Sequence, residues 1–293
     1  MENAHEKINC IVCGSDRANF YASKKGYKVV KCARCGTLFL DPLPKPQEAA
    51  AVYGQDYFGG AEKGHGYVDY DTDKEAMRSI FIRHLIHFEK LLKRPGKMLD
   101  VGAATGFFMK IAKSRGWEVC GVEISSFAAE AGRKNGLDII TGTLQNIKQA
   151  DDSFDLVTMW DVIEHMPDPV RDLHRVHSLL KPGGLVAVNT PDSGSFYSHV
   201  MGSRWHLFVP PEHIFYFNRK SISKLLQNSG FEVIEIGCIG KKFTVEYVIN
   251  FLYRWQKLGI WKKLSALIEN TWLGKLYFPI NLRDNMYVLA RKK

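Results

Sequence analysis

The sequence predicts an α/β protein: a doubly wound, Rossmann-like sheet preceded by a small N-terminal module and carrying a helical insertion before its last strand. Three patterns support this fold class. They are a glycine-containing turn between a strand and a helix, an acid that closes the next strand, and two pairs of cysteines near the N-terminus. With 293 residues, of which 45% are hydrophobic, the chain can bury one sizeable core and one accessory module.

The first element is a cysteine module. Cys10 and Cys13 form one C-x2-C pair, Cys32 and Cys35 form the second, and a glycine follows each pair. Two intervening residues let one tight turn present both thiolates, and four thiolates make the closed tetrahedral site of structural zinc. A disulfide interpretation needs an oxidising compartment, and the first residues lack the basic and apolar regions of a signal peptide. We therefore expect one structural zinc ion.

The second element is a strand, a glycine turn and a helix. Apolar Met98, Leu99 and Val101 indicate the end of a buried strand, and 107–114 has the apolar spacing of a helix. The turn between them, 102–106, contains two glycines and only small residues. Its backbone can approach a ligand closely, with N–H groups at a helix N-terminus.

The third element is a strand over 117–122 that ends in an acid, Glu123. An acid at this place accepts hydrogen bonds from ribose hydroxyls in dinucleotide folds. A NAD-type site expects G-x-G-x-x-G, and the middle glycine is missing between Gly102 and Gly106. The alternative is a strand–helix turn and a surface acid that bind no ligand.

The run Asp100-Val-Gly-Ala-Ala-Thr-Gly106, with Glu123, resembles motif I of class I S-adenosylmethionine (SAM) methyltransferases. The segment from Phe154 to Asp192 is similar to the core of methyltransferases acting on quinones and sugars. The resemblance implies a seven-stranded sheet whose last strand is antiparallel, and SAM as methyl donor. It also implies a set of cofactor-binding residues: Asp100, Gly102, Ala103, Gly106, Glu123, Leu144, Trp160 and Asp161.

A zinc ribbon, a Tyr-rich segment and then motif I resemble the deoxysugar C-methyltransferases. In that family tyrosines of this segment line the active site, which makes Tyr67 and Tyr70 candidates and Tyr70 the first choice. The alternative is that these rings only pack the segment against the core. We therefore divide the chain into residues 1–46 (ribbon and linker), 47–96 (Tyr-rich segment and a helix from about Thr72 to Lys93) and 97–293 (methyltransferase domain).

Methyl transfer to an oxygen or a carbon needs a base near neutral pKa, and histidine is the usual one. His213 follows two prolines and Glu212 in a run, EHIFYF, that resembles the sugar-methyltransferase pattern. The resemblance implies a catalytic role for both Glu212 and His213, whereas a structural histidine bonded to backbone is the alternative. His165 is expected to shape the cofactor pocket. Amine-methylating enzymes often carry Asn-Pro-Pro after the fourth strand. This position reads Trp160-Asp161-Val162-Ile163 here, which favours oxygen or carbon as the acceptor.

The insertion over 241–280 carries seven Lys or Arg residues against two Glu residues, interleaved with aromatic rings. Such a helical hairpin suits a membrane interface or a lipid-linked substrate. The alternative is an amphipathic cap packed over the active site with a solvated basic face.

These patterns predict a SAM-dependent enzyme that methylates a small metabolite, with a sugar nucleotide, a glycan or a quinone-like lipid as acceptor. Two other functions stay open: an RNA methyltransferase that recognises RNA through the ribbon, and a non-catalytic SAM-binding scaffold. The net charge of +9 and pI near 9.1 favour acidic partners without choosing one. No apolar run is long enough for a membrane helix, so we expect a cytoplasmic protein, with peripheral membrane contact through 241–280 as an open alternative.

Overall fold

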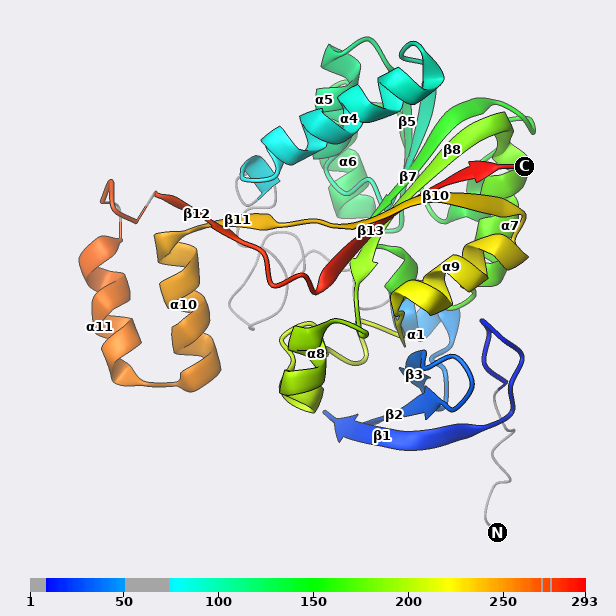
Figure 1. The fold of residues 1–293 in the computed structure, drawn as a ribbon. Helices are drawn as coiled ribbons and strands as arrows, with labels where there is room; N and C mark the ends of the chain where they lie inside the picture. Colours follow the sequence, from blue (N-terminus) through cyan, green and yellow to red (C-terminus); the bar gives the residue numbers. More distant parts are fainter. Residues whose placement is uncertain (1–8, 51–73, 270, 275) are drawn as a thin grey trace.

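A computed structural model describes residues 9–50, 74–269, 271–274 and 276–293 (Figure 1). Its centre is a seven-stranded sheet with strand order β10-β13-β8-β7-β4-β5-β6. The sheet strands run over Lys97–Val101 (β4), Glu118–Glu123 (β5), Ile139–Thr141 (β6), Phe154–Trp160 (β7), Leu180–Pro191 (β8), Phe231–Cys238 (β10) and Asn285–Lys292 (β13). Only β13 is antiparallel to its neighbours, β8 and β10. The predicted seven-stranded fold class is confirmed.

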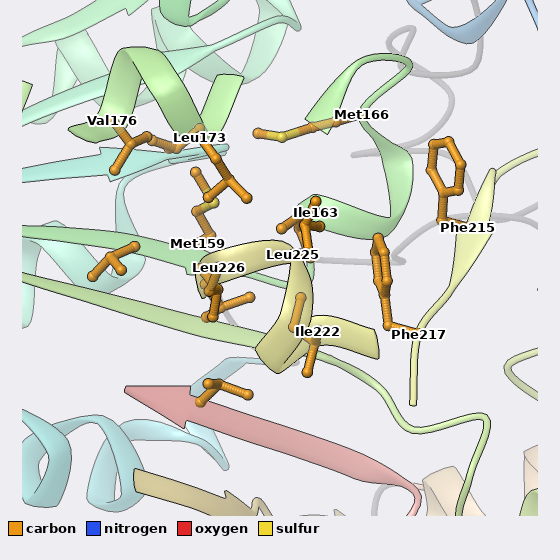
Figure 2. Packing of buried hydrophobic residues seen from close by; sticks show 14 of the residues in the cluster. Met159, Ile163, Met166, Leu173, Val176, Phe215, Phe217, Ile222, Leu225 and Leu226 are labelled. Carbon is orange, nitrogen blue, oxygen red and sulfur yellow. The ribbon is translucent and has the colours of Figure 1, made fainter. Parts of the chain in front are cut away.

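Helices cover both faces of this sheet, because successive strand residues point to opposite sides. On one face Met98 belongs to the cluster built with α4 (Arg78–Leu92), α5 (Phe107–Ser114) and α6 (Ser126–Lys134). On the other face Leu99 belongs to the cluster built with α7 (Pro169–Leu179) and α9 (Arg219–Asn228). Figure 2 shows part of this second cluster, where Leu173 and Val176 of α7 lie near Leu225 and Leu226 of α9.

The N-terminal residues form a second sheet, of order β1-β2-β3-β9. Its strands are Ala18–Lys24 (β1), Tyr27–Cys32 (β2), Leu38–Leu40 (β3) and Phe215–Tyr216 (β9), and α1 (Pro46–Ala50) follows them. Strand β9 comes from the far part of the chain and pairs antiparallel with β3, Leu38 facing Tyr216. The ribbon is therefore completed by the segment that directly follows His213.

The insertion is a helical hairpin carried by a pair of strands. Strands β11 (Lys241–Thr244) and β12 (Tyr277–Ile280) pair antiparallel and carry α10 (Val245–Gln256) and α11 (Gly259–Ile268). In Figure 1 the two helices lie apart from the seven-stranded sheet, at the end of the β11–β12 pair. No helix among the described residues has both the length and the apolar character needed to cross a bilayer.

Of the helix expected from about Thr72, residues 74–75 are helical, a turn follows at 76–77, and α4 begins at Arg78. Its buried side chains, Ile80, Phe81, Leu85 and Phe88, are those whose spacing predicted the helix. Residues 51–73 lie outside the described part of the chain, and this range includes Tyr67 and Tyr70.

Candidate functional site

One cavity of about 290 Å³ opens at the carboxyl ends of β4, β5, β6, β7 and β8. Ligands of open α/β sheets bind at this edge, where loops diverge from the strands. The cavity is lined by seven of the residues that the sequence singles out: Gly102, Glu123, Leu144, Trp160, Asp161, His165 and His213. Five of the eight predicted cofactor residues therefore share one space with the predicted base.

The glycine turn is built for close approach. Gly102 has φ +69°, and an added Cβ would lie 2.5 Å from Cγ2 of Val162. Its N–H donates to the carbonyl oxygen of Val122 at 2.8 Å, which ties the turn to β5. Ala103 and Gly106 lie in the same turn but not among the lining residues; Gly106, at φ +79°, is the N-cap of helix α5. The turn holds its shape without side chains that would fill the cavity.

Glu123 fastens this turn to the next loop. One carboxylate oxygen accepts the Ala104 N–H at 2.8 Å, and the other accepts the Ser125 N–H at 2.8 Å. Burial raises the pKa of Glu123, and the backbone N–H donors act in the opposite direction. Each oxygen keeps a second lone pair for a ligand hydroxyl. The acid at the strand end therefore both shapes the site and lines it.

Asp100 lies behind the turn and is not among the lining residues. Its carboxylate accepts a hydrogen bond from Thr158 Oγ1 at 2.6 Å, across the β4–β7 pair. Complete burial raises the pKa of Asp100 to about 7. Its place in the structure is a link between two strands beneath the cavity.

At the end of β7, Asp161 adopts φ +57°, a conformation that non-glycine residues rarely use. Its N–H donates to the carbonyl oxygen of Asn189 at 3.0 Å, and the Asn189 amide donates back to its carboxylate. Lys74 Nζ lies 3.7 Å from the same carboxylate, and Lys74 lines the cavity. The sequence offers no signal for this lysine, which reaches the site from just before α4.

Trp160 lines the cavity next to Asp161 and packs on the α4–α5 side. Its ring lies 5.1 Å from the rings of both Phe81 and Phe108. The indole is therefore held by the core and presents a fixed apolar surface to the cavity.

The imidazoles of His165 and His213 form one wall of the cavity. His213 donates from Nδ1 to the carbonyl oxygen of Leu207 at 2.9 Å, and His165 donates from Nδ1 to the carbonyl oxygen of Glu212 at 2.6 Å. Because a carbonyl oxygen only accepts, Nδ1 of each ring carries a proton, and in the neutral ring Nε2 is then the acceptor atom. Burial lowers the pKa of His165, which keeps that ring neutral.

Glu164 lies with these two rings, and one ligand atom of each residue lies within 4.8 Å of the others. This carboxylate accepts a hydrogen bond from Thr190 Oγ1 at 2.8 Å. Two histidines and one carboxylate at this spacing could share a proton or a divalent ion. His165 lines the cavity, and so does Glu164 beside it.

Of the other two predicted catalytic residues, the structure describes Glu212 and does not describe Tyr70. Glu212 contributes its backbone oxygen to His165, and its side chain is not among the lining residues that the structure describes. Tyr70 lies outside the described residues, so its predicted role stays a prediction.

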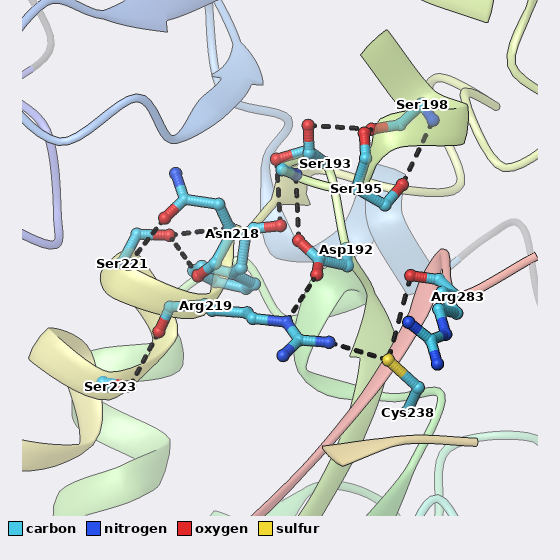
Figure 3. A network of polar contacts seen from close by, with 12 residues as sticks. Asp192, Ser193, Ser195, Ser198, Asn218, Arg219, Ser221, Ser223, Cys238 and Arg283 are labelled. Atoms are coloured by element: carbon cyan, nitrogen blue, oxygen red, sulfur yellow. Dashed lines mark hydrogen bonds and ion pairs between the residues drawn. The ribbon is translucent and has the colours of Figure 1, made fainter. Parts of the chain in front are cut away.

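The loop that carries His213 is anchored at both ends. Beyond β8, Asp192 accepts from the Gly194 N–H at 2.9 Å and pairs with Arg219 at the start of α9 at 3.1 Å (Figure 3). In the same network Ser193 Oγ donates to the carbonyl oxygen of Phe217 at 2.9 Å. These bonds hold the chain on either side of the loop against the body of the protein.

The four ribbon cysteines are brought together. Sγ of Cys10 lies 3.5 Å from Sγ of Cys35, the Cys13–Cys32 distance is also 3.5 Å, and all four sulfurs lie within 4.8 Å of one another. Tetrahedral Zn–S bonds of about 2.3 Å place sulfurs roughly 3.8 Å apart, so the cluster fits that geometry. None of these cysteines is in a disulfide.

Comparison with known proteins agrees with this geometry. The family described as methyltransferase domain matches residues 74–236, more than half of the chain. The ubiquinone biosynthesis O-methyltransferase of Azoarcus sp. is 26% identical over 183 residues, covering 56% of this chain and 78% of that protein. The chloroplastic 2-methyl-6-phytyl-1,4-hydroquinone methyltransferase 1 of Oryza sativa subsp. japonica is 31% identical over 154 residues, covering 50% of this chain and 44% of that protein.

Among solved structures, a SAM-dependent methyltransferase from Archaeoglobus fulgidus superposes with a TM-score of 0.50 at 18% identity, covering 76% of this chain and 99% of that chain. At this identity the likeness speaks for the fold. Together with the family match, it agrees with the glycine turn, the acid of β5 and the seven-stranded sheet. The chain belongs to the methyltransferase-domain family and is a class I SAM-dependent methyltransferase.

Proposed function

We propose that the enzyme methylates a hydroxyl oxygen of a small quinone-like acceptor, with His213 as the general base. The observation that supports it most is the shared cavity, which joins the glycine turn and Glu123 to the His165–His213 wall. The relatives named above act on ubiquinone precursors and a hydroquinone by name. A ring of this kind matches a cavity walled by Trp160, Met166 and Leu207.

SAM supplies an electrophilic sulfonium methyl when it is bound. The turn at Gly102 and Ala104, with Glu123 and Leu144, would hold it through close approach of the backbone, a carboxylate and an apolar contact. The chain's remaining task is to orient the acceptor and take its proton. Nδ1 of His213 donates to the carbonyl oxygen of Leu207, so Nε2 is the ring atom that would take this proton.

The test is SAH release from SAM with a panel of quinols, phenols and sugar nucleotides. We expect turnover with a hydroxylated quinol, and a loss of kcat of about a hundredfold or more in His213→Ala with SAH affinity unchanged. His199→Ala is the matched control, since this histidine is exposed on α8 (Phe196–Met201). Turnover on a sugar nucleotide or on RNA alone would overturn the acceptor class, and full activity of His213→Ala would overturn the base.

We also propose that Cys10, Cys13, Cys32 and Cys35 hold one structural zinc ion. The four sulfurs fit a tetrahedron, and a closed set of four thiolates leaves no position for a reacting water. Metal analysis of the purified chain should give one zinc per chain, and Cys13→Ser should lower that value. A metal-free wild-type chain with unchanged stability would contradict the proposal.

A further inference from the structure

The α10–α11 hairpin holds a dense set of exposed apolar side chains. Of the sixteen large apolar side chains exposed in the described chain, seven lie in this short stretch: Leu258, Ile260, Leu264, Leu267, Trp272, Leu273 and Leu276. Ile260, Leu264 and Leu267 are spaced four and three residues apart and therefore share one face of α11. Their exposures are 66%, 36% and 73%, and Trp272 is 72% exposed.

The hairpin is an ordered element, so this exposure is a property of its surface. Ser265 Oγ of α11 lies 2.6 Å from Asn250 Oδ1 of α10, and Ile268 is buried. The turn after α11 bonds back to the start of α10, where the Val245 N–H donates to Leu276 at 3.0 Å. The apolar side chains of α11 therefore extend beyond the side of the helix that packs on α10.

This face does not serve the cavity. No described residue of 241–280 is among those that line it. The cap over the active site that the sequence left open therefore finds no support in the lining, and the apolar face needs another partner. A contiguous exposed apolar patch commonly marks a protein or membrane interaction site.

The charges around the face select the partner. Lys263 of α11 and Lys257 in the turn before it are exposed beside the face, and Lys and Arg exceed Asp and Glu by seven to two over 241–280. A second copy of the chain meeting the same face would bring these lysines against their own copies. An anionic bilayer supplies negative charge for the lysines, an apolar interior for the leucines and an interface for the tryptophan.

We propose that the α10–α11 hairpin docks the enzyme on the surface of an anionic lipid bilayer. The face formed by Ile260, Leu264, Leu267 and Trp272 enters the boundary between headgroups and acyl chains. Lys257 and Lys263 contact lipid phosphates, and their apolar stems extend along the same surface. The hairpin lies on a membrane without crossing it. This proposal does not depend on the acceptor proposed above.

The experiment is flotation of the full-length, zinc-loaded protein with two kinds of vesicle, phosphatidylcholine alone and phosphatidylcholine with phosphatidylglycerol. We expect binding to the anionic vesicles that weakens as salt is raised. Leu267→Glu combined with Trp272→Ser should lower the partition coefficient at least about tenfold. Lys257→Glu combined with Lys263→Glu should give a loss of similar size on anionic vesicles alone.

The matched control is Phe20→Ser, which removes a side chain that is 65% exposed on β1 and should leave flotation unchanged. SAH titration of every variant checks that the fold is intact and needs no membrane. Absence of flotation by the wild type, or equal flotation of Leu267→Glu/Trp272→Ser, would overturn the proposal. Sedimentation that shows a dimer abolished by Leu267→Glu would also overturn it, because the face would then belong to a second copy.

Discussion

Replacing Glu123 by Gln tests the double role of this acid most directly. The side chain keeps its length but exchanges one acceptor oxygen for an NH2 group, which then faces a backbone N–H of Ala104 or Ser125. A buried donor without an acceptor costs about 1–3 kcal/mol. Because burial raises the pKa of Glu123, the neutral amide regains part of the desolvation cost, so we expect a net loss near 1 kcal/mol in the free energy of unfolding.

The larger effect is expected in cofactor binding. The variant displaces the turn and weakens any hydrogen bond to a ribose hydroxyl, so SAH affinity should fall about tenfold to a hundredfold. Titration calorimetry with SAH measures the affinity, and urea unfolding measures the stability. Glu118→Gln at the start of the same strand is the control, since its side chain is 71% exposed and should change either quantity little. An SAH affinity of Glu123→Gln within twofold of wild type, about 0.4 kcal/mol, would refute the reasoning.

Three further predictions concern the turn, the strand beneath it and the ribbon. Gly102→Ala adds about 1–2 kcal/mol of left-handed backbone strain and a contact with Val162, so SAH affinity should fall. Gly183→Ala, at φ +76° with open space around its Cβ, has the strain alone and should keep wild-type affinity. The pKa of Asp100, raised to about 7, makes the free energy of unfolding decrease as pH rises from about 4 to 7, by at most about 4 kcal/mol. Asp100→Asn should flatten that slope in urea melts; an unchanged slope would assign it to other groups. Chelation of zinc should speed amide exchange in β9 about tenfold or more while SAH affinity stays the same. Unchanged amide exchange in β9 after zinc removal would show that the ribbon does not stabilise this part of the site.

The cofactor half of the site could be predicted because its signals are local in sequence. Small residues over 102–106 and an acid that closes the next strand follow from backbone approach and hydrogen bonding, and parallel pairing of β4 with β5 brings the two together. Lys74 could not be found this way. It reaches Asp161 through the packing of α4 and the chain before it, which no nearby pattern encodes.

The histidine wall was only half predictable for a related reason. The residues around His213 identify it as a candidate base in the sequence. Its suitability as a base, however, depends on the hydrogen bond from Nδ1 to the carbonyl oxygen of Leu207, six residues earlier. His165 receives its orientation from the oxygen of Glu212, 47 residues away in the chain. Glu212 therefore contributes in the structure through its backbone, a role that the residue type does not reveal.

The boundary of the ribbon differs most from a division based on the sequence alone. Spacing of cysteines indicates a module over 1–46, yet its sheet needs β9, and Leu40 also donates its N–H to the carbonyl oxygen of Ile214 at 3.0 Å. Asn218 donates to the carbonyl oxygen of Cys35 at 3.0 Å, and Lys24 donates to that of Phe208 at 2.6 Å. The ribbon thus holds the loop that carries His213 from both sides. A strand of two residues, β9, has too few hydrogen bonds to hold itself in place, so the cysteine cluster that fixes β2 and β3 also fixes the position of the candidate base.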